Sequence, residues 1–339
     1  MMRTVFFLER ASELRFVSRL MIELKDHVVE VVSTDPKILD TTGLDFPLRF
    51  LKNKFEAYKY FVLLNSDVLI STAPYLGNSF FKKSLKKRVT YVNVIHSLKS
   101  LDISYEKNAF DQFDVILLSA YHQYRELTNQ SSNLNQILIP YGSEPIESLK
   151  SHRHKNLEKT VLVAPSWNGP LNDVNSLDSI FSALTRSNLK CIFRPHEIFL
   201  KKNRQKLFEL KKRYSKIDFT DSNLSNSDFI EAEIMISDVS GAAFEYAFGL
   251  ARPVLFFENK KHPYFEKKKS IHLCFELAIR NKTGQVFNES EIEELPNKIE
   301  QMKKVVKDFK LNPEEYLIYS SESQRASVAQ RLKSLVADR

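Results

Sequence analysis

Glycine is scarce in this chain of 339 residues, which contains only seven. Nucleotide-binding α/β proteins commonly use glycines where the backbone approaches a phosphate, so an anion site here must be built with few of them. The GxGxxG, Walker A, GxSxG and HExxH motifs are absent. Their absence argues against dinucleotide-binding proteins, P-loop enzymes, hydrolases with a nucleophile elbow and zinc proteases.

Cysteine is also rare. Cys191 and Cys274 each lie in an apolar run without zinc-site spacing, so we expect two reduced, buried thiols in a cytoplasmic protein. The N-terminal segment lacks the apolar stretch and cleavage site of a signal peptide. No window approaches the ~20 apolar residues that a membrane span needs. We therefore expect a soluble or peripheral protein.

Basic residues outnumber acidic ones, 50 to 42, and the net charge of +8 favours anionic partners. Lysines and arginines gather at 80–88 and at 201–213, where a solvated helix face is the ordinary interpretation. The first cluster also contains phenylalanines and could contact an anionic membrane. Neither cluster carries a nucleic-acid motif, so we expect no nucleic-acid partner. The basic residues of the first cluster are Lys82, Lys83, Lys86, Lys87 and Arg88.

Short apolar runs alternate with longer amphipathic stretches, a pattern typical of βα units and parallel sheets. A polar stretch at 140–159 indicates a connection between two domains. We predict Rossmann-like domains over 1–145 and 160–315, with a cleft between them, and a C-terminal helix at 316–339 that packs back toward the first domain. Helices are predicted at 48–63 and 78–87, among other places.

The segment IMISDVSGAAFEY places small and polar residues where a strand ends and a helix begins. Ser240 can cap the helix, and Asp238, Gly241 and Ala242 leave room for an anion at the free backbone N–H groups. Glu245 lies one turn further on, where a carboxylate could accept hydrogen bonds from ribose hydroxyls. A plain strand-to-helix turn with a serine cap is the alternative.

Two more strand ends carry histidine. CIFRPHE presents Arg194 and His196, which could bind or protonate a phosphate oxygen, although an ordinary turn histidine fits equally. NVIHSLKS presents His96 with Ser97 and Lys99 nearby. A lone histidine at a strand end is more often structural, but His96 is the best candidate for a general base because it would face the predicted cleft.

The segment VLVAPSWNG follows the first strand of the second half and holds the only tryptophan. Ser166, Trp167 and Asn168 would lie at the same edge as the other motifs. The indole could stack on a nucleotide base or simply cover the edge of the core.

The order of VLVAPSWNG, CIFRPHE and MISDVSGAAFEYAFGLARPVLFF resembles the C-terminal half of the CDP-glycerol glycerophosphotransferase family of teichoic-acid and capsule enzymes. NVIHSLKS falls where that family has its W-H-G-T segment. Ile95 and Ser97 stand where the family has Trp and Gly, and Gly241 replaces a second serine. The resemblance spans roughly residues 90–258.

The resemblance implies a GT-B fold and a metal-independent transferase, with no cofactor beyond its nucleotide-linked donor. It implies that His96 deprotonates the acceptor hydroxyl and that His196 lies at the donor phosphates. Ser240 and Gly241 match the family's phosphate-binding serines. Arg194 would help to offset charge on the leaving group, and Ser97 and Lys99 would lie on the acceptor side.

The sequence thus predicts a GT-B transferase that moves a polyol phosphate or sugar from a nucleotide-activated donor onto a glycan or lipid-linked acceptor of the cell envelope. A nucleotide-sugar epimerase of the same architecture is one alternative. A non-catalytic module that binds anionic polymers or membranes is another. The donor base, the acceptor, the number of residues added, the stereochemical outcome and the oligomeric state stay open.

Overall fold

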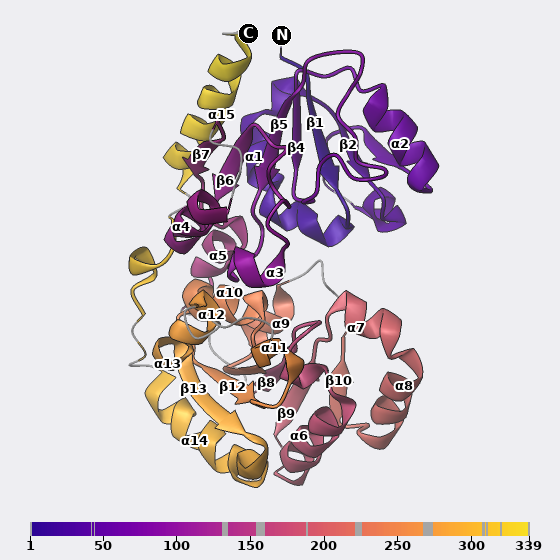
Figure 1. Ribbon diagram of the computed structural model, residues 1–339. Coiled ribbons are helices and arrows are strands. Elements are labelled where there is room, and N and C mark those ends of the chain that lie inside the picture. The colour runs from indigo at the N-terminus through magenta and orange to yellow at the C-terminus, as the bar shows by residue number, and fades with distance from the viewer. Residues whose placement is uncertain are drawn as a thin grey trace. The chain divides into compact units, whose positions relative to one another are not determined.

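The computed structural model describes residues 2–337 except 42, 44, 131–134, 154–159, 188, 221–225, 267–273, 307, 308, 310, 319 and 320. The chain forms two compact α/β units (Figure 1). Unit 1 consists of residues 1–97, 104–145 and 314–339, and unit 2 of residues 98–103 and 146–313. Residues 98–103 fall inside the predicted first domain but belong to unit 2.

Unit 1 contains a parallel sheet with strand order β3-β2-β1-β4-β5-β6-β7. Its strands are short and apolar, as expected for a sheet that is covered on both faces. They are β1 (Thr4–Leu8), β2 (Val28–Ser33), β3 (Leu48–Phe50), β4 (Val68–Ser71), β5 (Thr90–Val94), β6 (Val115–Leu118) and β7 (Ile137–Pro140).

The two faces of this sheet pack against different helices. Phe6 and Leu8 of β1 share a core with α1 (Ser18–Glu23) and α15 (Glu322–Ala337), the yellow C-terminal helix of Figure 1. Phe7 points to the other face, where its ring centroid lies 4.7 Å from that of Phe61 in α2 (Lys54–Val62) and 4.9 Å from that of Phe81. Unit 1 also contains α4 (Tyr121–Gln130), the first two residues of α5 (Glu144–Lys150) and the last residue of α3 (Leu101–Ser104). The other residues of α5 and α3 belong to unit 2.

Unit 2 contains a parallel sheet with strand order β10-β9-β8-β11-β12-β13. Its strands are β8 (Thr160–Val163), β9 (Lys190–Phe193), β10 (Ile217–Phe219), β11 (Ile234–Ser237), β12 (Val254–Glu258) and β13 (Gly284–Asn288). Its helices include α6 (Val174–Arg186), α7 (Glu197–Lys202), α8 (Arg204–Arg213), α9 (Ser227–Glu231), α10 (Gly241–Leu250), α11 (Pro263–Glu266), α12 (Phe275–Ala278), α13 (Arg280–Thr283) and α14 (Leu295–Val305).

The core of unit 2 is aromatic. Phe181 of α6 lies edge-on against Phe193 of β9, with ring centroids 5.0 Å apart, and residues of α6 and α14 bury this face. Phe244 of α10 stacks on Phe256 of β12 at 5.7 Å. Residues 243–250 of α10 are buried all round, so the helix lies deep in the unit, and only its first turn is partly open.

The predicted helix over 78–87 is wrong. The side-chain oxygen of Asn78 accepts hydrogen bonds from the backbone of Phe80 and Phe81, at 3.0 and 2.8 Å, which closes a turn instead of a helix. The predicted helix over 48–63 is only partly correct, because residues 48–50 form edge strand β3 and the helix begins after the Asn53 cap. Part of the predicted connection over 140–159 is helical, as α5.

None of the helices in the described part of the chain has both the length and the apolar character that a membrane crossing requires.

Candidate functional site

Three of the sequence motifs meet at one edge of the sheet in unit 2. Strands β9, β8 and β11 are neighbours, and the segments RPH, APSWNG and DVSG follow them directly. Because the strands are parallel, their carboxyl ends lie together. The strand order reverses between β8 and β11, and open α/β sheets bind their ligands outside such a switch point. The fold therefore brings together the motifs that the sequence analysis assigned to a donor site.

Asp238 ties two of these segments to each other. Its buried carboxylate accepts hydrogen bonds from the backbone N–H groups of Ser166, at 2.9 Å, and Leu171, at 3.1 Å. Burial raises the pKa of Asp238, while these donors and Lys99 oppose the shift. A Cβ at Gly169 would lie 2.3 Å from an Asp238 carboxylate oxygen and 2.4 Å from Ser166 Oγ, so this loop requires glycine at position 169. Asp238 thus organises the loop after β8.

Helix α10 begins at the same edge. Ser240 is its N-cap, and its hydroxyl accepts a hydrogen bond from the Ala242 N–H at 3.3 Å. Gly241 and Ala242 are partly exposed, so the first turn can be approached by an anion. Glu245 is buried, at 3% exposure, in the body of the helix. The predicted serine cap is confirmed.

The segment after β9 contains Arg194 and His196, and each side chain is held by neighbouring residues. Arg194 is buried over the Phe229 ring, 4.8 Å from its centroid, and pairs with Asp228 of α9 at 3.7 Å. His196 is the N-cap of α7, and its Nδ1 accepts a hydrogen bond from the Ile198 N–H at 3.2 Å. A neutral ring that accepts at Nδ1 carries its proton on Nε2, so the outer nitrogen is a hydrogen-bond donor.

Trp167 and Asn168 lie beyond Ser166 on the loop after β8. The Trp167 side chain is 40% exposed, so it is not part of the core. The Asn168 side-chain oxygen accepts a hydrogen bond from Lys99 Nζ at 3.3 Å. Lys99 is only 7% exposed, and its ammonium group lies 5.0 Å from the ring centroid of Tyr264. Lys99 is therefore a member of the unit 2 site.

The short segment 98–103 is locked into unit 2 by a reciprocal pair of hydrogen bonds. The Ser100 N–H donates to Glu276 at 2.9 Å, and the Ser100 hydroxyl accepts from the Phe275 N–H at 2.8 Å. Glu276 also accepts a 2.5 Å hydrogen bond from the Tyr264 hydroxyl. These contacts fix the position of Lys99 beside the loop after β8.

Unit 1 has its own group of polar residues at the carboxyl ends of β1, β4 and β5. His96 follows β5, is partly exposed, and lies against Phe16 with ring centroids 5.3 Å apart. Glu13 is buried nearby and accepts a 2.7 Å hydrogen bond from the Thr72 hydroxyl. Burial lowers the pKa of His96 below its usual value, Glu13 opposes this shift, and Arg10 adds to it. The lowered pKa favours the neutral form of the ring.

Sequence reasoning missed three members of these groups. Glu13, Tyr264 and Glu276 follow no recognisable strand-end motif, and only their packing reveals them. Ser97, in contrast, was predicted on the acceptor side; it is partly exposed in unit 1, and its carbonyl oxygen accepts a hydrogen bond from Gln123 at 2.8 Å. Within the described residues, no group of three His, Cys, Asp or Glu side chains is arranged to hold a metal ion.

Known structures with the same architecture include a wall teichoic acid polymerase, TagF (TM-score 0.62, 12% identity, covering 99% of this chain and 89% of that one). Two UDP-N-acetylglucosamine 2-epimerases are similar to the same degree. The enzyme from Methanocaldococcus jannaschii has a TM-score of 0.63 and 12% identity, over 98% of this chain and 100% of the other. The enzyme from Rickettsia bellii has a TM-score of 0.66 and 15% identity, over 99% and 98%. At these identities the likeness establishes the fold, which is GT-B as predicted.

No curated protein matches the chain at a significant level. A family description, CDP-glycerol:poly(glycerophosphate) glycerophosphotransferase, matches residues 147–330. This stretch is more than half of the chain and contains the three motifs of the unit 2 site. The predicted resemblance is therefore confirmed, and the chain belongs to the CDP-glycerol:poly(glycerophosphate) glycerophosphotransferase family and is a transferase.

Proposed function

We propose that this protein transfers a polyol phosphate, with CDP-glycerol as the favoured donor, to a hydroxyl group of a cell-surface glycan or lipid-linked acceptor. The observation that carries the proposal is the meeting of three motifs at the carboxyl ends of β9, β8 and β11 in a member of this family. Teichoic-acid and capsule polymers are the candidate products, and the cytoplasm, including its membrane surface around residues 82–88, is the proposed location.

The donor is proposed to bind in unit 2. Its phosphates would lie at the N–H groups of Gly241 and Ala242, where the partial positive charge of a helix N-terminus favours an anion. His196 would donate from Nε2 to a phosphate oxygen. Lys99 would supply positive charge for the donor phosphates. Arg194 would contribute less, because its charge is partly offset by its ion pair with Asp228.

The nucleotide's base and ribose would occupy the same unit. Trp167 is exposed on the loop after β8 and offers a flat surface for stacking. Glu245 is proposed to accept hydrogen bonds from the ribose hydroxyls. Ser166 and Asn168, which flank Trp167 on the loop after β8, are proposed to contact the donor as well. No metal ion or cofactor enters the proposal.

His96 is proposed as the general base. The acceptor hydroxyl oxygen attacks the phosphorus of the glycerol phosphate, the new P–O bond forms, and the P–O bond to CMP breaks. His96 takes the hydroxyl proton, and CMP leaves with the electrons of the broken bond. A pKa lowered by burial keeps the ring deprotonated at pH 7, as a base requires. Ser97 would contact the acceptor.

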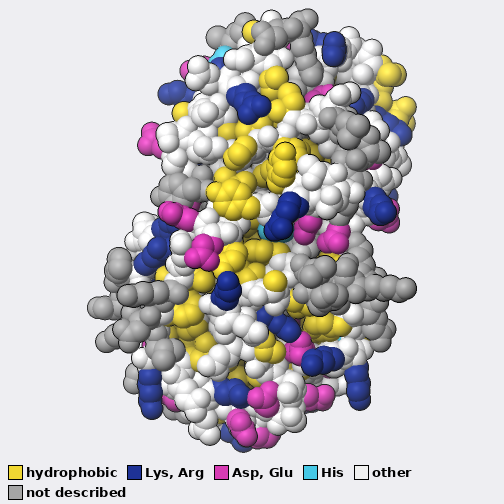
Figure 2. Space-filling model, turned by 60° about the vertical axis from the view of Figure 1, so that its left-hand side comes forward, with side chains coloured by type: hydrophobic (Ala, Val, Ile, Leu, Met, Phe, Trp, Pro, Cys, Tyr) yellow, Lys and Arg dark blue, Asp and Glu magenta, His cyan; other side chains and the backbone are white. Residues whose placement is uncertain are grey.

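The alternatives to a transferase are a nucleotide-sugar epimerase and a non-catalytic polymer-binding module. An epimerase would convert a nucleotide sugar without a second substrate. A polymer-binding module would need a continuous basic surface, whereas on the face drawn in Figure 2 the Lys and Arg side chains are interspersed with Asp and Glu.

The decisive experiment begins with thermal unfolding in the presence of CDP, CMP, UDP or GDP. A nucleotide at a concentration of a hundred times its Kd stabilises the native state by about 2.7 kcal/mol. At equal concentrations, the nucleotide that carries the donor's base should bind most tightly and raise the melting temperature most. Turnover of CDP-glycerol, with and without acceptor, then follows. We expect CMP release that depends on the acceptor, and its loss in His96→Ala with nucleotide binding retained. Normal turnover in His96→Ala would contradict the base assignment.

A further inference from the structure

A cavity of about 360 Å³ lies in unit 1 between α2 and the strands β1, β2 and β3, of which β3 is the edge strand of the sheet. Its lining includes Arg3 and Val5 at the start of β1, Val29 and Glu30 of β2, and Arg49 of β3. His96 follows β5, which is separated from β1 by β4 in the same sheet. The cavity is therefore separate from the groups assigned to the transfer reaction.

The polar side of the cavity carries an excess of positive charge. Arg49 pairs with Glu30 at 2.7 Å, and Glu30 also accepts a 2.8 Å hydrogen bond from the Tyr60 hydroxyl, so this acid is already satisfied. Arg3 and Lys59 add two exposed cations, against the one further carboxylate of Glu56 in the lining. The Glu56 carboxylate accepts a hydrogen bond from the Lys52 N–H at 3.1 Å. The cavity thus favours a ligand with a single negative charge.

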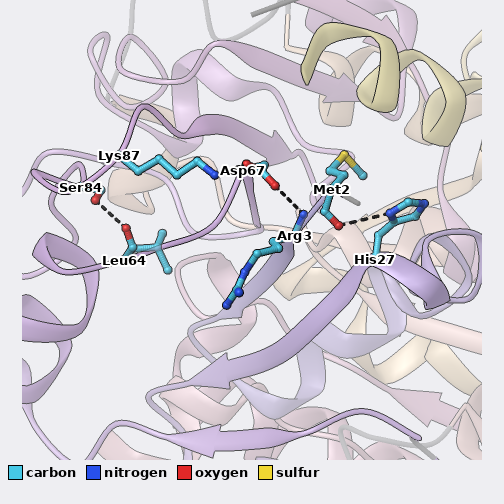
Figure 3. Close-up of polar contacts among 7 residues, drawn as sticks. All are labelled: Met2, Arg3, His27, Leu64, Asp67, Ser84 and Lys87. Atoms are coloured by element: carbon cyan, nitrogen blue, oxygen red, sulfur yellow. Dashed lines mark hydrogen bonds and ion pairs between the residues drawn. The ribbon is translucent and has the colours of Figure 1, made fainter. Parts of the chain in front are cut away.

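The Arg3 side chain is oriented by its surroundings. Figure 3 shows its guanidinium group directed away from Asp67, whose carboxylate instead accepts a 2.7 Å hydrogen bond from the Arg3 backbone N–H. Asp67 also forms an ion pair with Lys87. Arg3 is among the residues that line the cavity.

Exposed apolar side chains border the cavity. Leu63 lines it and is 43% exposed. The loop after Phe81 is bonded to the end of α2 and to Leu64, which lines the cavity. The Leu85 N–H donates to the Val62 carbonyl at 3.0 Å. The Ser84 hydroxyl donates to the Leu64 carbonyl at 2.7 Å, as Figure 3 shows. Leu85 is 83% exposed. Two leucines therefore project from neighbouring segments at one side of a basic pocket.

The same loop contributes further cations around these leucines. Lys83, Lys86, Lys87 and Arg88 are exposed on it. A surface that combines a pocket for one anionic group, exposed cations on a neighbouring loop and protruding apolar side chains matches the interface of an anionic bilayer, where phosphates and acyl chains lie close to each other. A soluble phosphate or a glycan would not require the leucines.

We propose that this cavity binds the phosphate headgroup of an anionic phospholipid, with Arg3 and Lys59 as its ligands, while Leu63 and Leu85 enter the acyl boundary. The surface would hold unit 1 at the membrane by the side that carries α2 and edge strand β3. The inference does not depend on the transfer reaction, because it uses no residue assigned to the donor or to the base.

The test is sedimentation of the full chain with vesicles of phosphatidylcholine that contain 30% phosphatidylglycerol, against vesicles of phosphatidylcholine alone. Each cation near an anionic surface contributes about fivefold in partitioning, so Arg3→Gln with Lys59→Gln should reduce binding about 25-fold. The charge-matched control is Lys201→Gln with Lys202→Gln on the exposed surface of α7 in unit 2, which should leave binding within about twofold.

A second pair of variants tests the apolar contribution. Leu63→Ser with Leu85→Ser should reduce binding to the anionic vesicles at least tenfold, whereas Phe208→Ser, which removes a 69% exposed ring from α8, should not. Circular dichroism melting checks that each variant is folded.

Three results would overturn the proposal. Wild-type protein that does not bind the anionic vesicles excludes a lipid ligand. Equal losses for the pocket pair and the α7 pair indicate general charge attraction without a pocket. Binding of soluble glycerol phosphate that depends on Arg3 and Lys59, with vesicle binding unaffected by the leucine variants, identifies a small anion as the ligand instead of a bilayer.

Discussion

Glu13 illustrates how a single residue can matter to a site without belonging to a motif. Its carboxylate accepts hydrogen bonds from the Glu9 N–H at 3.0 Å and from Thr72 at 2.7 Å, and its negative charge acts on His96. These contacts come from β1, β4 and β5, which are adjacent in the sheet but distant in sequence. His96 could be predicted because it directly follows a strand. Glu13 could not, because its partners are brought to it by the fold.

We expect Glu13→Gln to weaken the proposed base. Glu13 raises the pKa of His96 against the lowering effect of burial, so removing its charge should lower that pKa further. In the wild type the acidic limb of the kcat/KM profile should lie below pH 6.5. In the variant it should move to lower pH, with a lower plateau because a weaker base transfers the proton less readily. The measurement is a pH–rate profile with CDP-glycerol.

The free energy of unfolding should also depend on the ionisation of His96. Since the folded pKa of His96 is lowered, the unfolded chain binds the proton first, and the folded state loses stability as the pH falls below about 6.5. Asp26→Asn, an exposed acid of unit 1, is the control and should alter neither profile. A Glu13→Gln enzyme that is less stable but keeps the wild-type pH profile would assign Glu13 a structural role only.

At the scale of elements, the pattern of short continuous apolar runs predicted the parallel strands well, because strands that are buried on both faces need apolar residues at successive positions. It failed at 78–87, where lysines at helical spacing suggested an amphipathic helix. The backbone there is set by Asn78, which closes a turn, and by Phe81, which is anchored in the aromatic core of unit 1. It also failed at 48–50, because a three-residue edge strand is too short to show a period.

One element interaction that no pattern indicated is the cap of α1 by Glu144, the first residue of α5. The Glu144 carboxylate accepts hydrogen bonds from the N–H groups of Arg19, at 2.8 Å, and Leu20, at 3.0 Å, and from the Tyr141 hydroxyl. Burial raises the pKa of Glu144, and these donors oppose the shift. The 124 residues between Glu144 and Leu20 explain why sequence reasoning did not find the cap.

We expect Glu144→Gln to destabilise unit 1 by about 1–3 kcal/mol at pH 7, because an amide NH₂ would face backbone N–H donors. A raised folded pKa means that the folded state binds the proton more tightly. The wild type should therefore lose some stability as the pH rises from the pKa of Glu144 in the unfolded chain through its higher pKa in the folded protein. The variant, which has no carboxyl group at this position, should lack this dependence. Urea unfolding between pH 4 and 8 measures both effects.

Asp26→Asn, which changes an exposed acid of the same unit, is the matched control. This variant should change the free energy of unfolding by less than about 0.5 kcal/mol. Equal losses in the two variants would contradict the capping role of Glu144.

At the scale of the whole molecule, unit 1 is completed by the C-terminal helix. Val328, Ala329 and Leu332 of α15 are buried in the same core as Phe6 and Leu8 of β1. The sequence predicted a C-terminal helix that packs toward the first domain, but it could not identify the residues that the helix contacts. Contacts between segments some 320 residues apart are decided by tertiary packing, which local patterns do not encode.

We expect Leu332→Ala to reduce the stability of unit 1 by about 2–5 kcal/mol, the usual cost of truncating a fully buried leucine. Lys333→Ala, its exposed neighbour on the same helix, should have an effect within about 0.5 kcal/mol. Hydrogen exchange can assign the loss, since amides of β1 and β4 should exchange faster while those of β8 and β11 keep their rates. Unchanged exchange in β1 would show that α15 does not support this core.

The interleaving of the two units has a consequence for biosynthesis. Unit 1 requires residues 314–339, and unit 2 requires residues 98–103. A ribosome therefore completes β1 long before it makes α15, and the part of the apolar face that α15 covers stays exposed until then. During that interval the nascent chain should be a substrate for chaperones, and expression of residues 1–145 alone should yield an aggregation-prone fragment.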